Sequence, residues 1–175
     1  MTATVAALTG VVLLASGCNS KTDGKPEPTT TDTSAATTVL WDPCTQISDQ
    51  VLRQVGVDPA TKTSGAAGVE EPGWKICTWN NDDFNLVVFS TFRTVDEFKK
   101  KSENVDFVDT TVGGRSGMRY RQVDDKDDRI CDLIFPAKQG SFDVMVSNRI
   151  SSKNKVAPCL RASTAAEALV PLLPS

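Results

Sequence analysis

The chain contains no histidine, which is the commonest general base and the commonest metal ligand in proteins. Ser-His-Asp and Cys-His catalysis are therefore excluded within this chain. It also has no excess of basic residues, because 19 Lys and Arg stand against 22 Asp and Glu. We therefore expect no nucleic-acid partner. Finally, no apolar run reaches the roughly 18 residues that a membrane-spanning helix needs.

The composition present is that of one folded domain. A length of 175 residues suits a single domain, and 39% apolar with 23% charged residues allows a packed core. Wholesale disorder is excluded by the same numbers. The five cysteines are an odd number, which indicates that one of them differs in role from the other four.

The odd cysteine is Cys18, at the end of a short apolar stretch over residues 3–15. The segment Leu14-Ala15-Ser16-Gly17-Cys18 resembles the lipobox of bacterial lipoproteins. It predicts a signal peptide over residues 1–17 and a Cys18 thiol that carries palmitate or similar acyl chains, since two or more chains anchor a protein stably. An ordinary signal peptide, or an apolar helix with a buried cysteine, is the other interpretation.

The first ten residues depart from this pattern because they contain no Lys or Arg, whereas secretory signals normally begin with positive charge. Either Met1 lies downstream of the true start, or export depends on a weak signal. The following segment, residues 18–40, is rich in Thr and contains two prolines. It cannot bury enough apolar surface to offset the entropy of ordering, so we expect a disordered tether behind the lipidated cysteine.

The remaining residues, 41–175, form the predicted domain. We expect a helix from Asp42-Pro43 to Gly56, a loop over 58–73, a helix that Thr94 caps and that runs to Val105, and a helix from Pro158 to Pro171. Strands are expected over 74–79, 84–93, 107–112, 117–123, 130–135 and 141–150, with 84–93 central because both its faces are apolar. This order predicts an α+β fold, an antiparallel sheet of about five to six strands flanked by about three helices, in a monomer.

Four cysteines remain for the domain, and four allow three pairings. An exported protein meets an oxidising compartment, so disulfides are expected. Cys44 and Cys159 each follow a proline at a helix start, whereas Cys77 and Cys131 each lie in a strand. We pair the sequence neighbours, Cys44 with Cys77 and Cys131 with Cys159. A four-thiolate zinc site is disfavoured because zinc ligands come in close pairs and these cysteines are widely spaced.

These features together resemble an actinobacterial, mycobacterial-type envelope lipoprotein family that is catalogued as domain of unknown function three-five-five-eight. The resemblance implies an exported, lipid-anchored domain and supplies no catalytic residues. A sheet flanked by helices is similar to PsbP-like folds, by analogy only. The features that carry the resemblance are the lipobox, the Thr-rich tether, Trp41-Asp42-Pro43-Cys44, Cys77-Thr78-Trp79, and the Cys159 helix before Leu172-Leu173-Pro174.

No stretch predicts a catalytic, cofactor or metal site. The acidic segment 124–128 lacks the glycine and the ligand spacing of a calcium loop, which favours a solvated hairpin turn. The glycines of 113–117 lack the Gly-Lys-Ser/Thr of a phosphate loop, which favours a simple turn. No nucleophile elbow is present, and no paired carboxylate site is visible from the spacing. We therefore expect a protein that is not an enzyme.

The least ordinary surface feature is the basic and aromatic stretch Arg119-Tyr120-Arg121, whose two arginines alternate onto one face of a strand. It is suited to an anionic headgroup, a cell-wall polymer or an acidic partner, or it is an exposed sheet face. Trp74 and Trp79, with Trp41, are suited to lining a ligand groove or to packing around the disulfides.

These observations lead to two functional hypotheses. The first is a non-enzymatic lipoprotein anchored on the extracytoplasmic face of the cell membrane, which binds an envelope lipid or glycan in a cleft beside the sheet. It predicts an apolar concavity of a few hundred Å³. The alternative is a protein-interaction or accessory module for a membrane complex or sensor, with Arg119 as a candidate contact.

Overall fold

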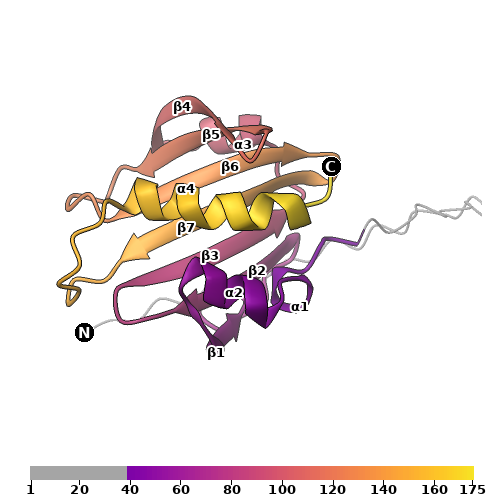
Figure 1. The fold of residues 1–175 in the computed structure, drawn as a ribbon. Helices are drawn as coiled ribbons and strands as arrows, with labels where there is room; N and C mark the ends of the chain where they lie inside the picture. Colours follow the sequence, from indigo (N-terminus) through magenta and orange to yellow (C-terminus); the bar gives the residue numbers. More distant parts are fainter. Residues whose placement is uncertain (1–38) are drawn as a thin grey trace, which may run out of the picture. The chain divides into compact units, whose positions relative to one another are not determined.

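A computed structural model describes residues 39–175 of the chain (Figure 1). The predicted signal peptide, the lipid site Cys18 and nearly all of the tether lie outside the described residues. Within residues 39–175, none of the helices combines the length and the apolar character needed to cross a bilayer.

The domain opens with two short helices where the sequence predicts one. Helix α1 (Pro43–Gln46) begins as expected, because the Asp42 carboxylate accepts a hydrogen bond of 2.9 Å from the Cys44 amide. The backbone is then extended at Ile47, and the Ser48 hydroxyl accepts from the Val51 amide to start α2 (Asp49–Val55). The prediction of one helix was wrong because this second capping residue interrupts it.

Seven antiparallel strands form one sheet in the order β1-β2-β3-β7-β6-β5-β4. The α+β class is confirmed, with a larger sheet than expected. Strand β3 lies third in this order, so its predicted central position is confirmed. The strands are β1 (Asp58–Ser64), β2 (Trp74–Asn80), β3 (Phe84–Thr91), β4 (Asn104–Val112), β5 (Arg115–Gln122), β6 (Ile130–Ala137) and β7 (Gly140–Asn148).

The extra strand is β1, in the segment 58–64 that the sequence analysis expected to be loop. Its side chains are nearly all exposed, so it has no apolar periodicity from which a strand could be predicted. It is held at the sheet edge by pairing with β2. Backbone hydrogen bonds to β2 therefore make residues 58–64 a strand, and the side-chain pattern of the segment does not.

The second predicted helix, 94–105, is also shorter than expected. The capping box between Thr94 and Glu97 starts α3 (Val95–Lys99) as predicted. The helix ends one turn later, where the Asn104 side-chain amide donates to the Phe98 carbonyl at 3.1 Å. Val105, which we expected on the helix, lies in β4. The strand is interrupted beside it at Asp106, which has a positive φ of 56°.

The main core lies between the sheet and helices α1, α2 and α4 (Pro158–Leu169), which all cover the near face in Figure 1. A one-turn 3-10 helix, Val170–Leu172, follows α4. Small residues of α4 let the helix lie close against β6 and β7. The fully buried side chains of this core include Trp79, Leu86, Val88, Phe135, Phe142, Val144, Ala162, Ala166 and Leu169.

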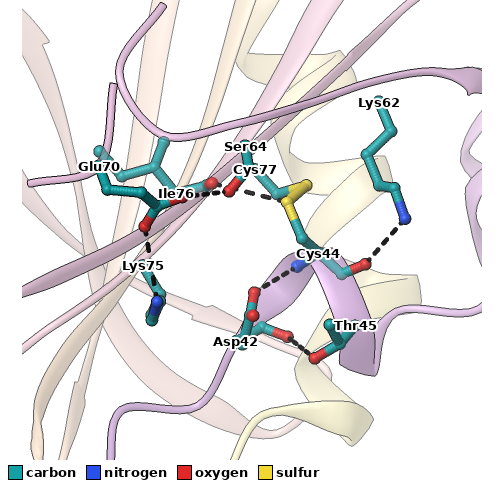
Figure 2. The surroundings of a disulfide bond; sticks show 9 residues. All are labelled: Asp42, Cys44, Thr45, Lys62, Ser64, Glu70, Lys75, Ile76 and Cys77. Atoms are coloured by element: carbon teal, nitrogen blue, oxygen red, sulfur yellow. Dashed lines mark hydrogen bonds and ion pairs between the residues drawn. A yellow bond between two sulfur atoms is a disulfide. The ribbon is translucent and has the colours of Figure 1, made fainter. Parts of the chain in front are cut away.

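Both predicted disulfides are present, and each joins a helix start to a strand of the sheet: Cys44–Cys77 and Cys131–Cys159. Figure 2 shows the first, beside the Asp42 cap and the Lys62 ammonium, which donates to the Cys44 carbonyl at 3.3 Å. Cys44 Sγ also lies 3.6 Å from the Ile76 carbonyl oxygen. This is a van der Waals contact and not a hydrogen bond, because a disulfide sulfur carries no proton. These bonds fix α1 and α4 to the same face of the sheet.

Removing either disulfide is expected to destabilise the domain by about 3–4 kcal/mol, because the two bonds close loops of similar length, with separations of 33 and 28 residues. Urea unfolding of C44S/C77S and C131S/C159S, each against the wild-type chain, measures this loss. Similar losses in both variants support a loop-entropy origin. An unchanged free energy of unfolding in either variant would contradict it.

Candidate functional site

The second face of the sheet is covered only in part, by the short helix α3. Phe98 of this helix is buried against Tyr120 and Ile134, which project from β5 and β6. A five-residue helix cannot cover seven strands, so part of this face stays open beside it. The candidate functional site lies at this opening.

Four aromatic side chains line the opening, those of Trp74, Phe89, Phe98 and Tyr120. Together with Phe107, which stacks on Tyr120, we call them the aromatic cluster. Trp74 meets Phe89 and Phe98 edge to face at 6.2 and 5.9 Å between ring centroids. Tyr120 stacks on Phe107 at 4.9 Å. These geometries are the favourable ones for aromatic pairs. The cluster therefore forms a fixed wall and not a loose surface group.

Two carboxyl groups are buried beside this wall. Asp132 of β6 and Asp143 of β7 are 1% and 2% exposed. In the ladder Asp132 pairs with Met145 and Asp143 with Ile134, so the two acids are diagonal neighbours on one face. The Tyr120 hydroxyl, from the next strand, donates a hydrogen bond of 2.5 Å to Asp143 Oδ2. Three strands thus bring a buried acid pair and a phenol together.

Burial raises the pKa of both carboxyl groups well above the ordinary aspartate range. For Asp132 the neighbouring Asp143 adds to this rise, because two like charges at close range disfavour each other. Burial also raises the pKa of Tyr120, so its hydroxyl remains a donor. At neutral pH the pair therefore holds a proton that two exposed carboxyl groups would have lost.

The carboxyl groups form the floor of a hollow of about 190 Å³. Gln122 covers Asp132, and its Nε2 lies 3.3 and 3.4 Å from the two carboxylate oxygens. These bonds are long for N–H···O contacts. At the mouth, Lys101 places its ammonium 5.6 Å from the Phe98 ring centroid and 6.0 Å from that of Trp74. The remaining lining residues are Phe89, Glu103, Asn104, Tyr120, Asp143 and Met145.

One atom of this site lacks a partner. Asp143 Oδ1 is buried and accepts no hydrogen bond from any of the described residues. Leaving a buried polar group unpaired costs about 1–3 kcal/mol, and more for a charged one. Asp143 Oδ1 is therefore an acceptor that a ligand donor could satisfy once the acid pair releases its proton.

The structure separates the residues that the sequence analysis singled out. Trp74 and Tyr120 lie at the hollow. Trp79 is fully buried in the main core, and Trp41 packs edge to face on Phe142 of the same core at 5.5 Å. Both of these tryptophans therefore pack in the main core, and neither lines the hollow beside α3.

The two arginines lie on the opposite face from Tyr120, as their alternation predicts. Arg121 forms ion pairs with Asp125 and Asp128. Arg119 is exposed and borders a different hollow of about 310 Å³ on the α4 face, together with Val108 and Leu160. Arg119 and Tyr120 therefore belong to separate surfaces.

The acidic turn 124–128 is less solvated than the sequence analysis predicted. The Asp125 side chain is 1% exposed and accepts from the amides of Arg129 and Ile130 at 3.0 and 2.8 Å. These two hydrogen bonds hold the ends of the turn together. The glycine turn is confirmed, with positive φ at Gly113 and Gly114 and a strand behind it. Among residues 39–175 no group of three metal-ligating side chains comes together.

The spacing of the sequence showed no paired carboxylate site, whereas the fold brings the carboxyl groups of Asp132 and Asp143 together. Spacing could not reveal it, because the pair arises from the register of β6 on β7. A weaker signal was present in the sequence. Each aspartate interrupts a run of apolar residues in a central strand, where an ionisable group is rarely buried without a reason.

Comparison with known proteins identifies one family. A family model described as "Protein of unknown function (DUF3558)" matches residues 13–172. No curated protein and no solved structure matches the chain at a significant level.

The raised pKa values predict that the contribution of the acid pair to the free energy of unfolding falls as pH rises from about 4 toward neutrality. Above pH 4 the unfolded chain releases these protons and the folded chain retains them, so the folded state binds more protons. One such proton contributes a slope of at most about 1.4 kcal/mol per pH unit. The variant D132N should lose part of this fall.

Urea unfolding between pH 4.5 and 8 measures how the free energy of unfolding depends on pH in D132N and in the wild-type chain. The control is D96N, which removes an exposed acid of α3 and leaves the buried acid pair in place. Parallel curves for D132N and the wild-type chain would contradict the buried-pair assignment.

Proposed function

The chain belongs to the DUF3558 family, and we propose that it is a non-enzymatic, lipid-anchored envelope protein that binds a small envelope ligand, a lipid headgroup or a glycan. The binding site is the hollow beside α3. The observation that carries this proposal is the unpartnered, buried Asp143 Oδ1 at the floor of an aromatic-lined opening.

The hollow is smaller and more polar than the apolar concavity that the sequence led us to expect. Its volume of about 190 Å³ is below the few hundred Å³ of drug-sized sites. Its lining combines aromatic faces with a few fixed polar groups, which is the usual composition of a ligand site. It suits a single sugar ring or a lipid headgroup, with the rest of the ligand outside.

The two disulfides indicate an extracytoplasmic location, because such bonds persist in oxidising compartments. Membrane attachment through Cys18 is the finer part of the proposal, and the lipobox resemblance supports it. A domain held near the bilayer meets envelope molecules at high local concentration.

A second candidate function is the protein-interaction module, and one observation favours it. Val108 and Leu160 are 47% and 62% exposed on either side of the hollow beside Arg119. Arginine is enriched at protein interfaces, and an interface would bury these exposed apolar side chains. This surface is on the opposite face from the aromatic cluster, so variants can separate the two functions.

Replacing Cys18 by serine should abolish lipid attachment, because the oxygen of serine cannot replace the thiol that is acylated. Metabolic labelling with a palmitate analogue and detergent phase partitioning in a mycobacterial host measure this. The nearby variant S20A is the control and should remain labelled. Retained label in C18S would contradict the anchor.

Native mass spectrometry of the protein from its envelope should show a co-purifying small molecule. The variant M145F, which places a larger side chain in the hollow, should lose this mass. The control L160A, on the α4 face, should keep it. A consistently empty wild-type protein would contradict the ligand-binding function. A cellular crosslinking partner lost in R119A/L160A would support the interaction module instead.

A further inference from the structure

The charges at the hollow are unbalanced in a way that selects its ligand. Three carboxyl groups line it, those of Glu103, Asp132 and Asp143, against one ammonium, that of Lys101. Lys101 is exposed at the mouth and forms no ion pair with the buried acids. Among the described residues no ammonium or guanidinium pairs with the two buried acids, and the proton that the pair holds at neutral pH is the charge that a bound cation would displace.

The floor offers acceptors that a ligand could satisfy. Asp143 receives one donor, Tyr120, on Oδ2, while its Oδ1 is unpartnered with the side chain 2% exposed. Asp132 accepts the long contacts from Gln122, and the Tyr120 hydroxyl that donates to Asp143 also interacts with it. A charged N–H donor forms shorter and stronger bonds to carboxylates than a neutral amide does, so it would displace the Gln122 contacts.

The mouth already favours a cation. The Lys101 ammonium lies over the faces of Trp74 and Phe98 at 6.0 and 5.6 Å, within the range of cation–π attraction. Because Lys101 is on the exposed turn after α3, it can leave without unfolding the helix. A ligand ammonium could then occupy the same place against the rings and donate downward to the acids.

We propose that the ligand bound in the α3-face hollow carries a primary ammonium group, which replaces that of Lys101 between Trp74 and Phe98 and donates to Asp143 and Asp132. This inference rests on the proposed function and specifies its ligand class. An anionic group would meet three carboxyl groups. A neutral hydroxyl would gain the hydrogen bond but not the attraction of the rings for charge.

Two sources supply such a group, an amino sugar and an ethanolamine headgroup, and matched probes distinguish them. Isothermal titration at pH 7 compares glucosamine with N-acetylglucosamine, and ethanolamine with N-acetylethanolamine. Each pair differs in the ammonium that acetylation removes. We expect the amine of at least one pair to bind at least tenfold more tightly than its acetylated partner. The pair that does so identifies the source.

Two variants are expected to change the affinity for the amine in opposite directions. D143N should weaken binding of that amine at least tenfold, whereas D96N, an exposed acid on α3, should leave it unchanged. K101Q should strengthen amine binding, because it vacates the aromatic site and removes a competing charge. K101Q also tests the inference should D143N fail to fold, since Lys101 is exposed.

Weaker amine binding in K101Q would overturn the inference, since that is the behaviour of a site whose lysine contacts an anion. Equal binding of the amine and acetylated probes would overturn it as well, while leaving the proposed function intact. Binding of Ca²⁺ or Mg²⁺ alone that D143N abolishes, with no response to amines, would assign the acids to a metal instead. An empty protein in native mass spectrometry together with no response to any probe would refute the proposed function too.

Discussion

The hydrogen bond from Tyr120 to Asp143 is the interaction on which the second face of the domain depends. A carboxyl group in the middle of a seven-stranded sheet is costly to bury, and the phenol supplies the donor that makes this position tolerable. The same bond holds the Tyr120 ring against Phe98 and Phe107. It therefore fixes the polar floor and the aromatic wall of the hollow at once.

The two faces of the sheet differ in their contribution to stability. The face under α1, α2 and α4 carries the main apolar core, and both disulfides fasten it. The opposite face has one short helix and keeps buried acids, which disfavour folding above pH 4. A fold stabilised on one face can retain an unfavourable polar arrangement on the other, which is the arrangement expected of a binding site.

The sequence predicted features that depend on neighbouring residues, such as helix caps and the cysteine environments. It did not predict features that depend on how distant strands pair. Prolines before Cys44 and Cys159 and strand patterns around Cys77 and Cys131, together with the choice to pair sequence neighbours, predicted both disulfides. Thr94 and Gly56 marked one helix start and one helix end. Strand β1 escaped because its side chains are exposed and only its backbone is held. The acid pair escaped because Asp132 and Asp143 meet through register alone.

The three tryptophans provide the most direct test of the central claim, that the α3-face hollow is the binding site. Trp74 lines it, whereas Trp41 and Trp79 pack in the main core on the other face. When a ¹⁵N-labelled sample is titrated with the lipid fraction and with the delipidated fraction of its own envelope, we expect the indole N–H resonance of Trp74 to shift and those of Trp41 and Trp79 to stay unchanged. A shift confined to Trp41 or Trp79, or no shift at all, would contradict it.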